Sequence, residues 1–199
     1  MDELPQDVQD ELMNSYLYKS FIKAFKFSIP INCSNVHARY TWTNLNFRNM
    51  MVGLMQNLEP ITFQKDEILI NELDPHLEIF FIMNDYCEVG FSINHQMIFN
   101  LQLMHSMIGA YGVTYNKNSH YIYKVSNNCK GFFVRRIKWL EILDTISVDT
   151  SDMFVKCFKQ ALKEQYEDKI NKVLHRCKVK ETTKMQSRFN SGIISLNVK

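Results

Sequence analysis

The strongest constraint on the fold is a block of short apolar runs between residues 61 and 134, separated from one another by polar turns. The runs are rich in aromatic and β-branched side chains, which is typical of β-strands. They comprise residues 61–63, 68–70, 79–83, 87–91, 97–103, 108–112, 121–125 and 132–134. Because no segment between them is long enough for a helical crossover, the block predicts a jelly-roll-like antiparallel β-roll of about eight strands.

Local turns within this block predict how its strands are connected. The polar turn at residues 65–67 predicts that the strands on either side of it pair with each other. The turn at Asn84-Asp85 likewise predicts a hairpin in the centre of the block. A glycine pair, Gly109 and Gly112, indicates backbone that bends tightly or approaches a ligand closely.

Helical periodicity flanks the block on both sides. Apolar residues at spacings of three and four predict helices at residues 4–26, 44–57, 137–143 and 151–178. Thr43 or Asn44 caps the second of these helices, and Pro60 ends it. The predicted fold class is therefore α+β. The predicted domains are a linker-like helical region at 1–43, the β-roll with its flanking helices at 44–178, and a polar tail at 179–199.

Composition narrows the classes of function. The formal net charge of +2 gives no reason to expect nucleic acid as a partner. The five cysteines are widely spaced without a C-x-x-C motif, which argues against both a disulfide framework and a zinc site. No window approaches the ~20 apolar residues of a membrane span, and the N-terminus has no apolar signal core. The sequence therefore predicts a cytoplasmic chain, which is either a whole protein or a fragment of a larger one.

No catalytic motif is present. The sequence contains no G-x-S-x-G, no H-E-x-x-H and no P-loop. The expectation is therefore that the chain is not an enzyme and holds no metal.

The order of these segments resembles the cyclic-nucleotide-binding fold over roughly residues 4 to 178. In that family, helices precede a strand-rich roll, which is interrupted by a Gly-x-x-Gly turn and followed by a short helix and a long one. The matching stretches are Ile68 to Glu72 with Leu73 in place of a glycine, Glu78 to Asn84, Ile108-Gly109, and Gly131 to Trp139. The Leu4-Pro5 start resembles the linker helix of hyperpolarization-activated and ether-à-go-go-type potassium channels. The stretches Gly109 to Lys117 and Cys129 to Arg136 are similar to ciliate potassium-channel relatives.

The resemblance implies a phosphate-binding cassette, in which backbone N–H groups and an arginine hold a cyclic phosphate while a glutamate holds the ribose. Its residues here are Ile108, Gly109, Ala110, Tyr111, Gly112, Ser119 and His120. Aligned without gaps, the glutamate position is Ala110 and the arginine position is Ser119. Each charge-assisted hydrogen bond is worth ~1.5–3 kcal/mol, so losing both weakens binding by several orders of magnitude. The cassette is therefore predicted to be degenerate, with cyclic AMP and cyclic GMP as doubtful ligands.

Several residues of this cassette have two interpretations. Lys117 or Lys124 could supply the missing charge, although a lysine lacks the planar fork of an arginine. His120 is either a pH-sensitive phosphate contact or an exposed loop histidine. The tyrosines fill the vacant pocket from within or pack as alternating residues of a strand, and they are Tyr111, Tyr115, Tyr121 and Tyr123.

The resemblance implies a non-catalytic regulatory module of a potassium or cation channel, which acts by conformational coupling. Its partners are then other subunits of the same assembly, as a homo-oligomer, and a pore in a longer chain at the cytoplasmic face of a membrane. Two alternatives stay open: a stand-alone scaffold for protein–protein interaction, and a nucleotide sensor with an altered cassette.

Overall fold

The computed structural model of this chain describes residues 5, 8, 19–25, 44–93, 96–149, 154–172 and 175. Several predictions fall outside these residues. They are most of the first helix, the irregular segment before Thr43, the cap of the long helix at 150–152, and the tail at 179–199. Both predicted domain boundaries also lie there and stay predictions.

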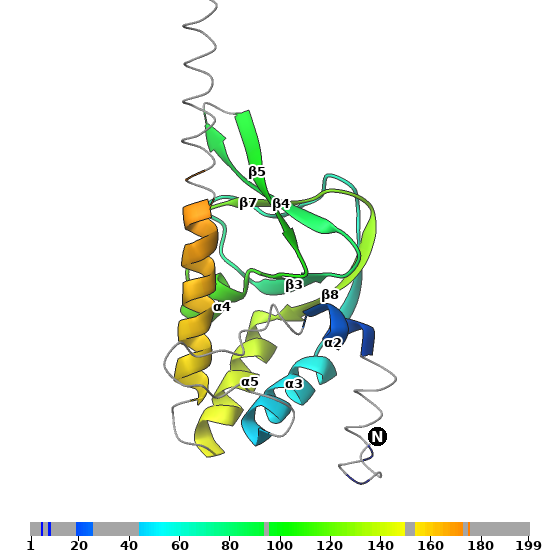
Figure 1. The fold of residues 1–199 in the computed structure, drawn as a ribbon, viewed down its shortest axis with the longest axis vertical. Coiled ribbons are helices and arrows are strands. Elements are labelled where there is room, and N and C mark those ends of the chain that lie inside the picture. Colours follow the sequence, from blue (N-terminus) through cyan, green and yellow to red (C-terminus); the bar gives the residue numbers. More distant parts are fainter. Residues whose placement is uncertain are drawn as a thin grey trace, which may run out of the picture.

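The described chain contains the expected mixture of helices and strands (Figure 1). The labelled helices are α2 (Lys19–Phe25), α3 (Leu45–Gln56), α4 (Ala110–Tyr115) and α5 (Arg136–Asp149). A further helix covers residues 154–172 and is called the 154–172 helix below. The strands are β1 (Glu59–Phe63), β2 (Ile68–Ile70), β3 (Glu78–Ile82), β4 (Tyr86–Ile93), β5 (Gln96–Met104), β6 (Met107–Ile108), β7 (Ile122–Val125) and β8 (Cys129–Arg135). The prediction of about eight strands in an α+β fold is confirmed.

The strands form two antiparallel sheets that face each other. Their strand orders are β1-β8-β3-β6 and β2-β7-β4-β5. Apolar side chains from both sheets meet in one cluster, which includes Phe63, Phe80, Val89 and Tyr123. This arrangement is a two-layered roll whose interior is filled by side chains.

Two predicted hairpins are wrong. β1 does not pair with β2, because Ile61 lies opposite Gly131 of β8 and Ile68 lies opposite Lys124 of β7. β3 and β4 are also in different sheets. At each of these turns the chain crosses to the other sheet, so a turn signal marks a change of direction without identifying the partner strand. Of the strands described, only β4 and β5 are consecutive and paired.

The second predicted helix is confirmed as α3. The side chain of Asn44 accepts a hydrogen bond from the Phe47 backbone N–H at 3.0 Å, which satisfies one free donor of the first turn. One face of α3 is buried, through Phe47, Met50, Met51, Leu54 and Met55. The helix ends at Gln56, and Pro60 lies inside β1 instead of ending the helix. Pro60 is tolerated because β1 is an edge strand.

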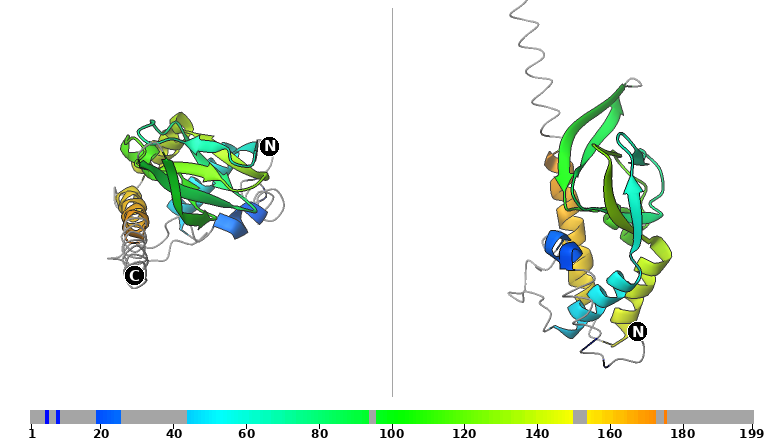
Figure 2. Two further views of the ribbon diagram at one scale, coloured as in Figure 1. Left: turned by 90° about the horizontal axis from the view of Figure 1, so that it is seen from above. Right: turned by 90° about the vertical axis from the view of Figure 1, so that its right-hand side faces the viewer.

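The helices pack below the roll, and the 154–172 helix runs along its side (Figures 1 and 2). From α2, Phe21 and Phe25 are fully buried and contact Phe81 of β3 at ring-centroid distances of 5.2 Å each. Trp139 of α5 belongs to the same cluster and is also fully buried. A single apolar core therefore joins α2, α3 and α5 to the outer face of the β3-β8 sheet.

Candidate functional site

The site is built around the turn that connects β6 to α4. Gly109 caps α4 with a φ of 88°, a left-handed conformation that favours glycine. A Cβ atom on Gly109 would also lie 2.7 Å from the carbonyl oxygen of Glu78. A Cβ atom on Gly112 would lie 1.8 Å from Cδ2 of His76. The tight bend expected at this glycine pair is therefore present at Gly109, whereas the group that lies close to Gly112 is the ring of His76.

The structure brings only part of the predicted cassette together. Ile108, Ala110 and Gly112 are buried, and Tyr111 is half-buried beside them. Ser119 is buried too, but its hydroxyl donates to the carbonyl oxygen of Tyr121 at 2.7 Å and accepts from that residue's N–H at 3.3 Å. The Ser119 hydroxyl is therefore engaged by hydrogen bonds within its own turn.

Two of the cassette tyrosines lie on a helix and not on a strand. Tyr111 and Tyr115 are four residues apart on α4, with ring centroids 5.0 Å apart. Tyr121 and Tyr123 are buried in the interior of the roll. The interpretation of all four as alternating strand residues is therefore wrong, because the run around the glycines continues as a helix after Ile108.

The 154–172 helix covers this turn through three polar or aromatic contacts. The ring of Tyr166 stacks on Tyr111 with a centroid distance of 4.0 Å and an interplanar angle of 5°. The Tyr166 hydroxyl lies 2.8 Å from Nδ1 of His120. The Tyr115 hydroxyl donates to the carbonyl oxygen of Lys159 at 2.7 Å. His120 is exposed, but its contact with Tyr166 joins its loop to the helix, so it is not only a solvent-exposed loop residue.

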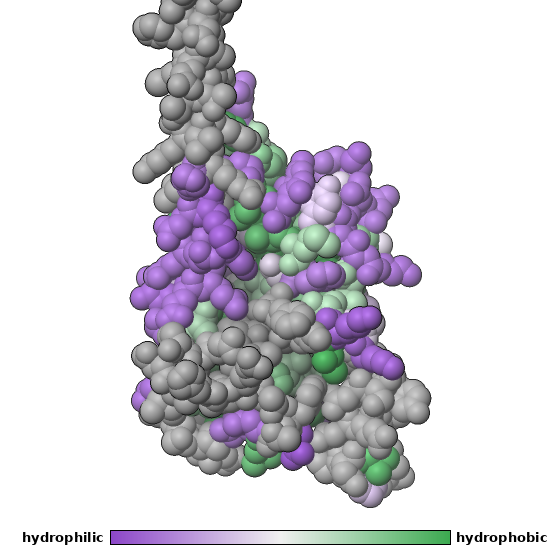
Figure 3. All heavy atoms as spheres, viewed as in Figure 1, coloured by the Kyte–Doolittle hydropathy of each residue, from purple (hydrophilic) through white to green (hydrophobic). Residues whose placement is uncertain are grey.

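Apolar contacts extend the same interface. Phe158 is fully buried, 5.8 Å from the Trp139 ring, and Leu162 is buried in the same cluster as Ala110. Phe158 reaches α5, while the next turns of the helix cover the cassette. Figure 3 shows hydrophilic residues over the outward side of this helix.

A small cavity remains between α4 and the 154–172 helix. Its volume is about 30 Å³. A cavity needs roughly 10–15 Å³ to hold one water molecule, whereas pockets for organic ligands are commonly about 300–1,000 Å³. The predicted cassette residues that line it are Ile108, Gly109, Ala110, Tyr111 and Gly112, whereas Ser119 and His120 do not.

The sequence did not single out two titratable residues of this cavity, His76 and Lys169. His76 is 5% exposed, and its buried Nδ1 has no hydrogen-bond partner among the described residues. Burial, and then the charge of His120, lowers the pKa of His76 to about 4, so the ring is neutral at pH 7. Burial also lowers the pKa of Lys169 to about 8. His76 lies in a predicted loop and Lys169 in a predicted helix. Neither pattern predicts that the side chain faces this cavity.

The lysines proposed as replacements for the arginine do not reach the cavity. Lys124 forms ion pairs with Glu88 at 2.9 Å and Asp66 at 3.1 Å. The hydrogen bond to Glu88 is the main cause that raises the pKa of Lys124. Lys117 is exposed after the end of α4. Among the described residues that line the cavity, Lys169 is the one formal cation.

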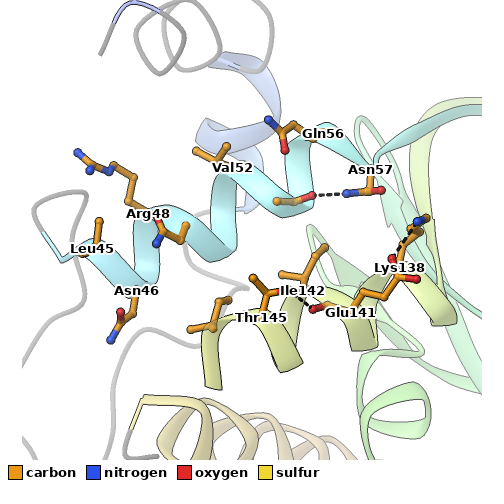
Figure 4. A pocket seen from close by; sticks show the side chains of 13 residues that line it. Leu45, Asn46, Arg48, Val52, Gln56, Asn57, Lys138, Glu141, Ile142 and Thr145 are labelled. Atoms are coloured by element: carbon orange, nitrogen blue, oxygen red, sulfur yellow. Dashed lines mark hydrogen bonds and ion pairs between the residues drawn. The ribbon is translucent and has the colours of Figure 1, made fainter. Parts of the chain in front are cut away.

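A larger hollow of about 640 Å³ lies between α3 and α5 (Figure 4). Four of the polar side chains that line it bond within their own helices. The Asn57 amide donates to the Gly53 carbonyl oxygen at 2.8 Å, and Lys138 pairs with Glu141 at 2.8 Å. The Thr145 hydroxyl donates to the carbonyl oxygen of Glu141. These four side chains are therefore engaged by their own helices.

None of the helices described combines the length and the apolarity that crossing a membrane requires. Within the same residues, no group of three or more His, Cys, Asp or Glu side chains could hold a metal ion.

No protein-family model matches this sequence, and no curated protein matches it either. Similar solved structures include the cAMP-bound EAL enzyme Bd1971, at 16% identity and a TM-score of 0.46 over 67% of this chain and 34% of that one. The regulatory domain of Toxoplasma gondii PKA with cAMP has 11% identity and a TM-score of 0.46 over 70% and 46%. A cAMP-binding acyltransferase mutant from Mycobacterium smegmatis has 20% identity and a TM-score of 0.39 over 47% and 29%. The chain spans less than half the length of each of these proteins.

Proposed function

We propose that this chain is a non-catalytic regulatory module of the cyclic-nucleotide-binding type, whose pocket is occupied by its own 154–172 helix. The observation that carries the proposal is the position of Tyr166, which stacks on Tyr111 at 4.0 Å and contacts His120 at 2.8 Å. The ring of Tyr166 lines the cavity beside the cassette and covers the turn that would face a ligand. In this proposal the 154–172 helix occupies the pocket in place of a ligand.

The chemistry of the turn supports this proposal. A buried cyclic phosphate needs converging donors and a cation with the geometry of an arginine. Ala110 carries no polar side-chain atom, and the Ser119 hydroxyl bonds within its own turn. The cavity of about 30 Å³ cannot accept a nucleotide unless the helix moves away.

The mechanism we propose is conformational coupling between the helix and the rest of the domain. Phe158 of the helix packs on Trp139 of α5, and α5 shares its core with Phe21 and Phe25 of α2. A signal that shifts the helix therefore changes the packing of α2, which belongs to the linker-like region. The sequence resemblance to channel linkers supports a place in a potassium or cation channel, with other subunits as partners.

Calorimetric titration with cyclic AMP and cyclic GMP tests the first half of the proposal. We expect neither nucleotide to bind with a dissociation constant at or below about 1 μM, which corresponds to about −8 kcal/mol. Tighter binding would overturn the self-occupied pocket. If that binding were also lost in Lys169→Met, the result would favour the alternative of a sensor with an altered cassette, since Lys169 lines the cavity.

Hydrogen exchange tests the second half. Tyr166→Ala removes the stack, so we expect faster exchange in both the 154–172 helix and residues 108–125. Tyr166→Phe keeps the ring and removes only the hydroxyl contact to His120, so it is the matched control and should change exchange much less. Faster exchange in the helix alone would show that the cassette does not depend on it. The scaffold alternative would then be preferred, because its surfaces do not require a movable helix.

A further inference from the structure

The lining of the small cavity between α4 and the 154–172 helix is unbalanced in charge. Lys169 is the formal cation of this lining, and none of the described residues that line the cavity is an aspartate or a glutamate. The other polar side chains of the lining can each donate a hydrogen bond, and they belong to His76, Tyr111, Tyr123, Gln165 and Tyr166. A cavity with a cation and several donors but no acid favours a negatively charged ligand.

His76 enters this lining from the loop between β2 and β3. Its ring lies against the glycine pair, with Nδ1 3.2 Å from the position of a Cβ atom on Gly109 and Cδ2 1.8 Å from that position on Gly112. The residue is 5% exposed, and its buried Nδ1 has no hydrogen-bond partner within the part of the chain that the structure describes. Buried polar atoms are normally paired with protein, with water or with another bound group. This nitrogen therefore requires a partner that the described protein atoms do not supply.

Lys169 reaches the cavity from the 154–172 helix, which runs beside α4 (Figure 1). The neighbouring carboxylate of Asp168 pairs with Lys172 at 2.5 Å, on the exposed side of the helix. No ion pair joins Lys169 itself to a carboxylate of the described residues. A cation that is drawn out of water without a counterion is destabilising. The charge of Lys169 is therefore a second feature of the cavity, independent of His76, that favours a bound anion.

We propose that the cavity binds one small inorganic monoanion of about the size of a water molecule, such as chloride, between the Lys169 ammonium and Nδ1 of His76. The volume of about 30 Å³ exceeds the roughly 10–15 Å³ that one water molecule needs and excludes an organic anion. The ion neutralises the ammonium and accepts a hydrogen bond from the His76 tautomer that carries its proton on Nδ1. A water molecule would pair with His76 but would leave the charge of Lys169 uncompensated.

The bound ion would link the helix to the roll, because Lys169 belongs to the helix and His76 to the loop before β3. This inference rests on the proposed function, in which the 154–172 helix is docked on the cassette. It adds a regulator of that docking, since undocking would separate the two contacts of the ion. Anion binding and helix docking therefore favour each other.

Urea unfolding near pH 7 tests the proposal, with chloride replaced stepwise by gluconate at constant ionic strength, because gluconate is too large for the cavity. A ligand that binds only the folded chain raises the ratio of folded to unfolded protein by the factor 1 + [L]/Kd. If the site is half-filled at about 15 mM, about 150 mM chloride should raise that ratio about elevenfold. Crystals grown in bromide give the location, and we expect the anomalous signal of the heavier halide between His76 and Lys169.

Lys169→Met should abolish the chloride response. In gluconate this variant should be at least as stable as the unchanged chain, because it removes an uncompensated charge from the cavity. Lys172→Met is the matched control, since it removes the same charge from an exposed residue of the same helix, and it should keep the full response. In the unchanged chain, chloride should also slow hydrogen exchange in the 154–172 helix and in residues 108–112 together.

The outcomes separate this inference from the proposed function. A chloride response below about twofold in the unchanged chain, or the same response in Lys169→Met, would overturn the anion site and leave water as the occupant. If exchange in Tyr166→Ala shows that the helix is docked while chloride has no effect, the proposed function stands and the anion site fails. If Tyr166→Ala shows no docking, both fail.

Discussion

Gly112→Ala is expected to destabilise the protein even though alanine is the better helix former. Gly112 lies inside α4, where alanine should be favoured by about 0.5–1 kcal/mol. The added methyl group, however, would lie 1.8 Å from Cδ2 and 2.4 Å from Cγ of the His76 ring. Overpacking of this kind typically costs about 1–3 kcal/mol, so the net change should be a loss of up to about 2.5 kcal/mol.

The cause can be isolated with a double-mutant cycle. His76→Ala removes the ring, so Gly112→Ala in that background should be neutral or stabilising. The coupling free energy between the two sites should then be about 1–3 kcal/mol, measured by urea unfolding of the four proteins. If Gly112→Ala stabilises the unchanged protein, or if the two effects are simply additive, the close approach of His76 to α4 is wrong.

Three other outcomes follow from the same packing and charges. Phe158→Ala should lower the free energy of unfolding by about 3–5 kcal/mol, because the ring is buried against Trp139; a loss below about 1 kcal/mol would show that the helix is not docked. Protonation of His76 favours the unfolded chain, since its pKa is about 4 in the fold and 6.5 ordinarily. Its contribution is present above pH 6.5 and is lost as the pH falls towards 4, by about 3 kcal/mol in total. His76→Gln should remove this part of the acid sensitivity in urea titrations at several pH values, and an unchanged pH profile would contradict it. Finally, the sequence predicts self-association through the N-terminal helices from Tyr16, Tyr18, Phe21, Phe25 and Phe27. Phe21 and Phe25 are instead buried in the core, so the prediction depends on the other three; light scattering on the full chain should give a mass above 23.6 kDa, and a monomeric mass would disprove it.

Local patterns in the sequence determined the elements of this protein. The β-branched and aromatic runs predicted about eight strands, because alternation along a strand depends on near neighbours. The run 108–112 is the exception, since β6 ends at Ile108 and the chain continues as α4. The cap at Asn44 and the apolar stripe of α3 are likewise contained within one segment. The glycine pair indicated a tight turn, since the left-handed conformation of Gly109 is a property of a single residue.

The partners of these elements were decided only by the tertiary structure. β1 pairs with β8 and not with its neighbour β2, and the hydroxyl of Tyr115 reaches Lys159, which lies 44 residues further along the chain. The sequence predicts only that Tyr166 belongs to the apolar stripe of a helix. Its stacking on Tyr111 depends on how the 154–172 helix packs against α4. His76 gives no local signal at all. A hydrogen-bond ladder or an aromatic stack between distant segments depends on the packing of the whole chain, because many partners satisfy the same local preferences and the shared core selects among them.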